Sequence, residues 1–185
     1  APRSLDLGTA TQYMPSMGVP AAGGGGNENL RAGMQYLMQQ YGLQPYQAAA
    51  MIGNFAQESG GNTGAKGDPS LPGGSFGIAQ HNRERLHGGG KYMGLLPFSR
   101  QQGRDPSDLY TQLDYVMHEL QGPERAAYEQ LLSAPDLESA TVAFGRAYER
   151  PDEKKANYEN RIAQARAYLG GGVQQSPFEL VPLDN

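Results

Sequence analysis

The chain has 185 residues, a length that suits one domain with a sizeable core, and it carries a net charge of −4. It has no cysteine, which excludes disulfides, thiolate metal ligands and a cysteine nucleophile. It has no basic run longer than Lys154-Lys155 and no apolar stretch of roughly twenty residues, which argues against a nucleic-acid partner and a membrane span.

Both ends of the chain differ in composition from its middle. Residues 1–26 are rich in Gly, Ala, Pro and Ser and end in four glycines, which predicts a flexible linker. Residues 171–185 predict a second extended segment, a C-terminal tail. We therefore expect the folded domain to occupy residues 27–170.

Helical periodicity dominates this middle region. Asn27 begins a segment in which apolar residues recur with a 3.6-residue period, and Gly42 ends it. Pro45 begins a second helix, which ends at Gly60-Gly61. Later helices are expected to start at first-turn or capping residues, namely Asp105-Pro106, Pro123, Pro135 and Asp152.

Residues 60–80 interrupt the helical pattern. They are rich in Gly and Pro, and only 75–78 resemble a strand. The sequence therefore predicts a mainly α fold of the α+β kind. Its helical domain would carry a small Gly-rich hairpin or loop lobe after the second helix.

Glu58 stands in the last turn of the second predicted helix. It shares a helix face with Phe55 and Met51, three and seven residues earlier. Apolar neighbours and the negative end of the helix dipole both disfavour an anion, so we expect the protonated form to be favoured. Glycoside cleavage requires a proton donor of this kind. The simpler alternative is a solvated glutamate at a helix end.

Two motifs carry a resemblance to a known superfamily. The segment 57–62 (QESGGN), followed by 74–80 (GSFGIAQ), resembles the signature of the lysozyme superfamily, with its soluble lytic transglycosylases and goose-type lysozymes. The helix AAAMIGNFAQESGGN, the late segment 144–148 and Arg161-Ile162 resemble in particular the phage tail lysozyme family. The resemblance spans roughly residues 27–169.

This resemblance implies that Glu58 is the catalytic acid and that Ser75 and Gln80 face the substrate from the small lobe. Gln80 offers both a donor and an acceptor to a sugar or its acetamido group. Many relatives have a tryptophan directly after this glutamine, whereas this chain has His81. Tyrosines, Tyr92 or Tyr148 among them, are therefore expected to stack against the sugars.

A second carboxylate is less clearly marked, and two residues compete for the role. Asp68 follows Glu58 by ten residues, in an order similar to that of small phage muramidases; the alternative is a plain turn at Asp68-Pro69. Glu149 is the rival, as the second carboxylate or as a substrate contact. Its alternative role is a salt bridge with a neighbouring arginine.

The three histidines, His81, His87 and His118, have no metal-ligand spacing, so neither a metal nor a cofactor is expected. The resemblance implies a muramidase that cleaves the β-1,4 bond between N-acetylmuramic acid and N-acetylglucosamine in bacterial peptidoglycan. It also implies a place on the phage particle, among other virion proteins, with action at the cell wall or periplasm during entry. Two alternatives stay open: a lytic transglycosylase that forms 1,6-anhydro products, and a non-catalytic glycan-binding tail domain.

Overall fold

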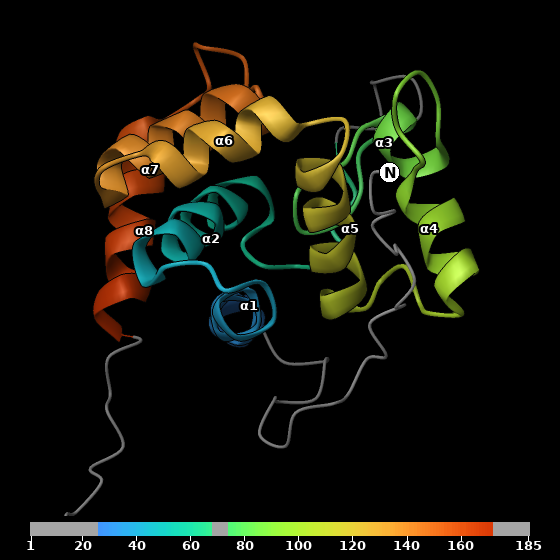
Figure 1. Ribbon diagram of the computed structural model, residues 1–185, viewed down its shortest axis with the longest axis horizontal. Helices are drawn as coiled ribbons and strands as arrows, with labels where there is room; N and C mark the ends of the chain where they lie inside the picture. Colours follow the sequence, from blue (N-terminus) through green and yellow to red (C-terminus); the bar gives the residue numbers. More distant parts are fainter. Residues whose placement is uncertain (1–25, 68–73, 172–185) are drawn as a thin grey trace, which may run out of the picture.

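The computed structural model describes residues 26–67 and 74–171, and these residues are mainly helical (Figure 1). The predicted mainly α class is therefore confirmed. The elements follow one another as α1 (Gly26–Tyr41), α2 (Pro45–Ser59), α3 (Arg83–His87), α4 (Leu95–Gln102), α5 (Leu109–Gln121), α6 (Arg125–Ser133), α7 (Leu137–Phe144), the π-helical turn η1 (Gly145–Glu149) and α8 (Tyr158–Gly171). None of these helices is long and apolar enough to cross a membrane. The predicted linker and tail lie almost entirely outside the described residues.

Helix α2 is the central helix of the domain. It packs against α1 on one side and against α7 and α8 on the other, and Figure 1 shows it between them. Its residues from Gln47 to Phe55 are all buried, which explains the run of small and apolar side chains there. At Gly53 the backbone of α8 comes so close that an added Cβ would lie 2.7 Å from the Cβ of Ala165.

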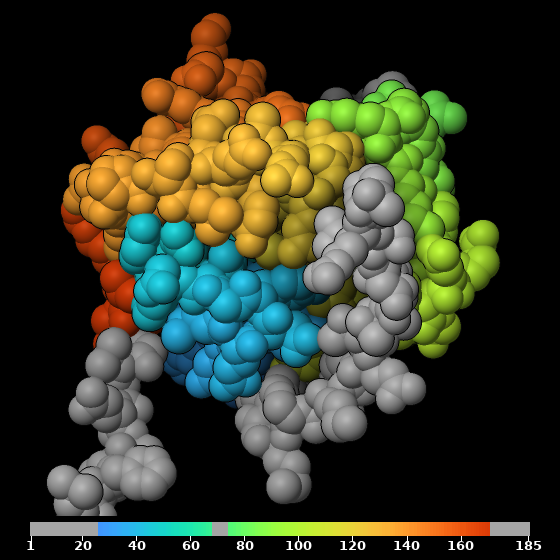
Figure 2. Space-filling model, viewed as in Figure 1, coloured from blue at the N-terminus to red at the C-terminus, as the bar shows by residue number. Residues whose placement is uncertain are grey.

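Helix α5 joins two hydrophobic cores. Its residues Leu113, Val116 and Leu120 belong to the large core beneath α1, α2 and α7. Its Tyr115 instead packs with Leu95 and Phe98 in a smaller core. This smaller core lies under α3 and α4, which form the right-hand side of the molecule in Figure 2 (green).

Several helix starts differ from the sequence-based positions. Pro45 does open α2, and Gly60 ends it in the left-handed conformation, as expected. However, α5 and α7 are capped by Asp108 and Asp136. The side chain of each aspartate accepts the backbone N–H of the residue three positions later in the chain. The expected starts at Asp105 and Pro135 are therefore wrong.

The last helix also begins later than expected. Asp152 was expected to cap it, but its carbonyl accepts the N–H of Lys155 in a separate turn. Helix α8 begins only at Tyr158. The expected start at Asp152 is therefore wrong as well.

The lobe after α2 contains isolated bridges and no strand among its described residues. Phe76 pairs with Lys66 on one side and with His81 on the other. The turn from Phe76 to His81 passes through Gly77, whose positive φ of 84° favours glycine. The expected hairpin is thus reduced to these two bridges.

Candidate active site

Glu58 lies in the last turn of α2, and its side chain is 21% exposed. The guanidinium of Arg161, from α8, donates a 2.6 Å hydrogen bond from Nη2 to Oε1 of Glu58. Sequence considerations predicted apolar surroundings for this carboxyl group. The structure adds a buried cation, so the surroundings of Glu58 are apolar on its helix face and charged at its tip.

Arg161 is held rigidly because all three of its nitrogens donate hydrogen bonds. Besides Glu58, it binds the carbonyl of Ala156 through Nε (2.6 Å) and Oδ1 of Asn54 through Nη1 (3.0 Å). Asn54 is fixed in turn, because its amide donates to the carbonyls of Ala50 (2.8 Å) and Thr141 (3.0 Å). The planar guanidinium therefore has one orientation, and it sets the position of the Glu58 carboxyl group.

Sequence reasoning included Arg161 in the family resemblance but assigned it no role. A signal was present. Arg161 lies three residues after Tyr158 and four before Ala165, so a charged residue occupies the apolar stripe of α8. Its side chain is 2% exposed. A buried charge requires a partner, and here the partner is Glu58.

Glu149, the last residue of η1, brings a second carboxyl group to this region. Its Oε1 is buried and has no hydrogen-bond partner. Burial raises the pKa of Glu149 well above its usual range, and the Glu58 carboxylate raises it further, while Arg85 and Arg161 act in the opposite direction. The expected alternative was a salt bridge with a neighbouring arginine, but Arg150 pairs with Glu124 instead.

Tyr148 is fully buried beneath this region, so the expected contact between its ring and a sugar does not fit the structure. Phe144 stacks on the ring at 4.8 Å between centroids, and the guanidinium of Arg85 lies 4.0 Å from the ring centre. The hydroxyl group of Tyr148 donates to Glu119. Sequence considerations identified an aromatic ring but not that protein atoms cover it.

Glu119 and Arg85 form a second buried ion pair next to Tyr148. The Nη2 atom of Arg85 lies 2.9 Å from Oε2 of Glu119, and both side chains are less than a tenth exposed. Burial raises the pKa of Glu119, while Arg85 and the hydroxyl of Tyr148 oppose the rise. These two residues tie α3 to α5 close to Glu149.

The small lobe holds Ser75 and Gln80 together, but through each other. The hydroxyl of Ser75 donates to Oε1 of Gln80 at 2.8 Å. The amide nitrogen of Gln80 donates to the carbonyls of Gly77 (2.9 Å) and Ala65 (3.2 Å). Both amide hydrogens of Gln80 are thus used within the lobe. The donor expected to reach a sugar is therefore not free.

Ser59, next to Glu58, connects the lobe to the end of α2. Its hydroxyl lies 2.9 Å from the carbonyl oxygen of Ile78, to which it donates a hydrogen bond. Gln112 of α5 secures the same turn, because its Oε1 accepts the N–H of Ile78 at 2.8 Å. Ser59 thus holds the small lobe next to the carboxyl group of Glu58, the residue that precedes it.

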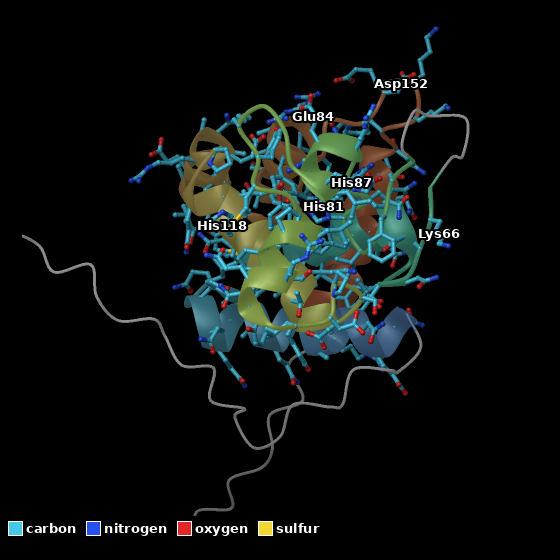
Figure 3. All side chains as sticks on the ribbon, turned by 90° about the vertical axis from the view of Figure 1, so that its right-hand side faces the viewer. Lys66, His81, Glu84, His87, His118 and Asp152 are labelled. Atoms are coloured by element: carbon cyan, nitrogen blue, oxygen red, sulfur yellow. The ribbon has the colours of Figure 1, made fainter. Side chains whose placement is uncertain are left out.

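His81 is fully buried directly after this turn, and its Nδ1 has no partner. Burial lowers its pKa well below the usual value, and Arg85 lowers it further, so the ring is neutral. His118 lies apart from His81 and His87 in Figure 3. Within the described ranges no three potential metal ligands come together.

The other candidate for the second carboxylate, Asp68, lies outside the described residues. Tyr92, the second tyrosine considered for stacking, is partly buried, and its hydroxyl donates to Glu124.

Comparison with protein families finds that the model described as phage tail lysozyme matches residues 28–170. No curated protein and no solved structure gives a significant match.

Proposed function

The chain belongs to the phage tail lysozyme family and is a lysozyme-like domain that acts on peptidoglycan; from this premise we propose that it is a muramidase with Glu58 as its general acid. The bond cleaved is the β-1,4 linkage between N-acetylmuramic acid and N-acetylglucosamine. The observation that supports this role is the placement of Glu58. It is a partly exposed carboxyl group at the end of a rigid buried helix, oriented by the guanidinium of Arg161.

In this proposal Glu58 donates its proton to the glycosidic oxygen as the bond from that oxygen to the sugar carbon breaks. The positive charge that develops on the sugar is then quenched by water, which gives a reducing end. A second carboxylate assists the water. Asp68 remains a candidate for this role, and Glu149, whose Oε1 is buried without a hydrogen-bond partner, is the other.

The description of the family supports a phage particle as the place of this chain. We propose that it is carried with other virion proteins and opens the bacterial wall locally, at the wall or in the periplasm, during entry.

The test is digestion of purified peptidoglycan by the wild type and by Glu58→Gln. Glutamine can still accept the hydrogen bond from Arg161, so the fold should persist while the acid is lost. We expect a fall in rate of about 100-fold or more. Glu159→Gln, the same change at an exposed position of α8, is the control and should clear peptidoglycan like the wild type.

Mass spectrometry of the digest separates the alternatives. A muramidase leaves reducing ends, which borohydride reduces. A lytic transglycosylase leaves 1,6-anhydro ends, which borohydride does not reduce. Retention of a third or more of the wild-type rate by Glu58→Gln would exclude Glu58 as the acid. Binding of peptidoglycan without any cleavage by the wild type would favour a glycan-binding tail domain.

A further inference from the structure

Glu149 lies at the end of a turn with unusual geometry. The turn η1 is π-helical and is closed by a hydrogen bond from the N–H of Arg150 to the carbonyl of Gly145 at 2.8 Å. Arg150 itself adopts the left-handed conformation, with a φ of 51° that non-glycine residues rarely take. π-Helical turns inside α-helical segments occur often at functional sites.

Charged groups from four helices act on this carboxyl group. They are Glu58 of α2, Arg85 of α3, Glu119 of α5 and Arg161 of α8. We call Glu149 and these four residues the charge cluster. Tyr148, the preceding residue, also faces Glu149, but its fully buried hydroxyl stays protonated because burial raises its pKa well above the usual value.

The charges within the cluster do not balance if every carboxyl group is ionised. Arg161 donates to Glu58, and Arg85 is paired with Glu119. Each guanidinium thus already has a carboxylate partner, and Glu149 would be a third carboxylate facing two cations. An unpaired buried charge is costly, and Oε1 of Glu149 accepts no hydrogen bond that would compensate. The cluster therefore retains one proton.

We propose that Glu58 and Glu149 share this proton, and that Glu149 is a positioning residue that keeps it available to Glu58. At rest the proton is on Glu149, and Arg161 neutralises the Glu58 carboxylate. When the proton moves to Glu58, the negative charge passes to Glu149, which Arg85 and Arg161 face. This inference rests on the proposed role of Glu58 as the acid.

The proton count closes over one reaction cycle. Glu58 gives the shared proton to the departing sugar oxygen, and both carboxyl groups are then ionised. The proton released when water adds to the sugar returns to the pair. Because two like charges near each other are disfavoured, the pair regains that proton readily.

The first test is the pH profile of kcat/KM for Glu149→Gln, which keeps the size of the side chain but cannot ionise. Without the second carboxyl group the pair no longer retains a proton. The alkaline limb should therefore move to lower pH by about one unit or more, while activity at acid pH persists. The control is Glu124→Gln, because Glu124 is a buried carboxyl group near the same turn that is paired with Arg150, outside the cluster. If Glu149→Gln and wild type have the same alkaline limb, the proposal is wrong.

The second test does not depend on activity or on the folding of the Glu149 variant. Carbon-13 NMR of labelled glutamate carboxyl groups follows Glu149 through a pH titration in the wild type and in Glu58→Gln. Loss of the neighbouring carboxylate should lower the titration midpoint of Glu149 by about one unit or more. An unchanged midpoint overturns the shared proton. If the midpoint of Glu149 is lowered in Glu58→Gln but the wild type cleaves no peptidoglycan, the shared proton is supported and the muramidase proposal is overturned.

Discussion

Arg161 connects three parts of the molecule through one side chain. It binds Glu58 and Asn54 of α2, and Asn54 binds the carbonyl of Thr141 in α7. Replacing it with methionine would leave Oδ1 of Asn54 and the carbonyl of Ala156 buried without a donor. We expect Arg161→Met to lower the free energy of unfolding by about 3 kcal/mol, measured by urea denaturation.

The control for this prediction is Arg125→Met, which removes an exposed ion pair with Glu129 and should cost less than about 1 kcal/mol. Arg161→Met should also lower kcat, because the Glu58 carboxyl group loses the donor that orients it. Arg161→Lys keeps the charge but loses the planar fork, so it should recover little of that loss in kcat. Equal effects of Arg161→Met and Arg125→Met would contradict the central role of Arg161.

The sequence was informative about Glu58 and less so about its neighbours. A local motif identifies the glutamate, because the helix end and the adjacent serine lie within a few residues. Arg161 is 103 positions away, and its partner follows only from the crossing of α2 and α8. The residue type likewise does not show whether a side chain is buried. For this reason Tyr148 was expected to contact sugars, although its ring is covered by protein.

At the scale of elements, the approach of α8 to α2 at Gly53 sets the distance between Arg161 and Glu58. A methyl group at Gly53 would collide with the carbonyl of Arg161 and with Ala165. Gly53→Ala should therefore push the helices apart, lower the free energy of unfolding by about 1–3 kcal/mol and reduce kcat, as thermal denaturation and peptidoglycan turnover would measure.

Gly170→Ala makes the same substitution near the end of α8, where an added Cβ meets nothing within 4 Å. It should leave stability unchanged or slightly higher, because alanine favours helix more than glycine does. A stable and fully active Gly53→Ala protein would show that the close approach is not required.

Helices that carry local signals were predictable, whereas those shaped by their surroundings were not. Pro45 and the glycines after Ser59 mark α2, and an apolar period marks α1. The segments α3 and α4 have only five and eight residues, too few for a clear period, and they form around the small core of Leu95, Phe98 and Tyr115. No local sequence pattern predicts the π-helical geometry of η1.

At the scale of the whole molecule, the neutral buried His81 makes stability depend on pH. Its folded-state pKa lies well below 6.5, the value expected when the chain is unfolded. Below pH 6.5 the unfolded chain therefore binds a proton that the folded protein does not, and stability falls as the pH falls. The loss should approach about 1.4 kcal/mol per pH unit until the folded pKa is reached.

The buried carboxyl groups act in the opposite direction, because Glu119 and Glu149 have raised pKa values and stabilise the fold at low pH. The contribution of His81 to the pH dependence is therefore measured by difference. The free energy of unfolding is determined from pH 7 to pH 5 for the wild type and for His81→Gln, and the two curves are compared. His87→Gln, at an exposed position, should follow the wild-type slope. If the His81→Gln and wild-type slopes agree, the ring titrates without coupling to folding.

The π-helical turn has a consequence for helical phase. Each residue of an α-helix advances the side chain by about 100° around the axis, and a π turn holds one residue more than the α turn it replaces. If the same five residues continued α7 as a plain α-helix, each would turn by the full α angle, and Glu149 would lie well further around the axis than it does in η1. The carboxyl group would then leave the neighbourhood of Glu58, Arg85 and Arg161 although every residue type of the site was kept. The winding of the turn, and not the residue type alone, thus brings the second carboxyl group to this site.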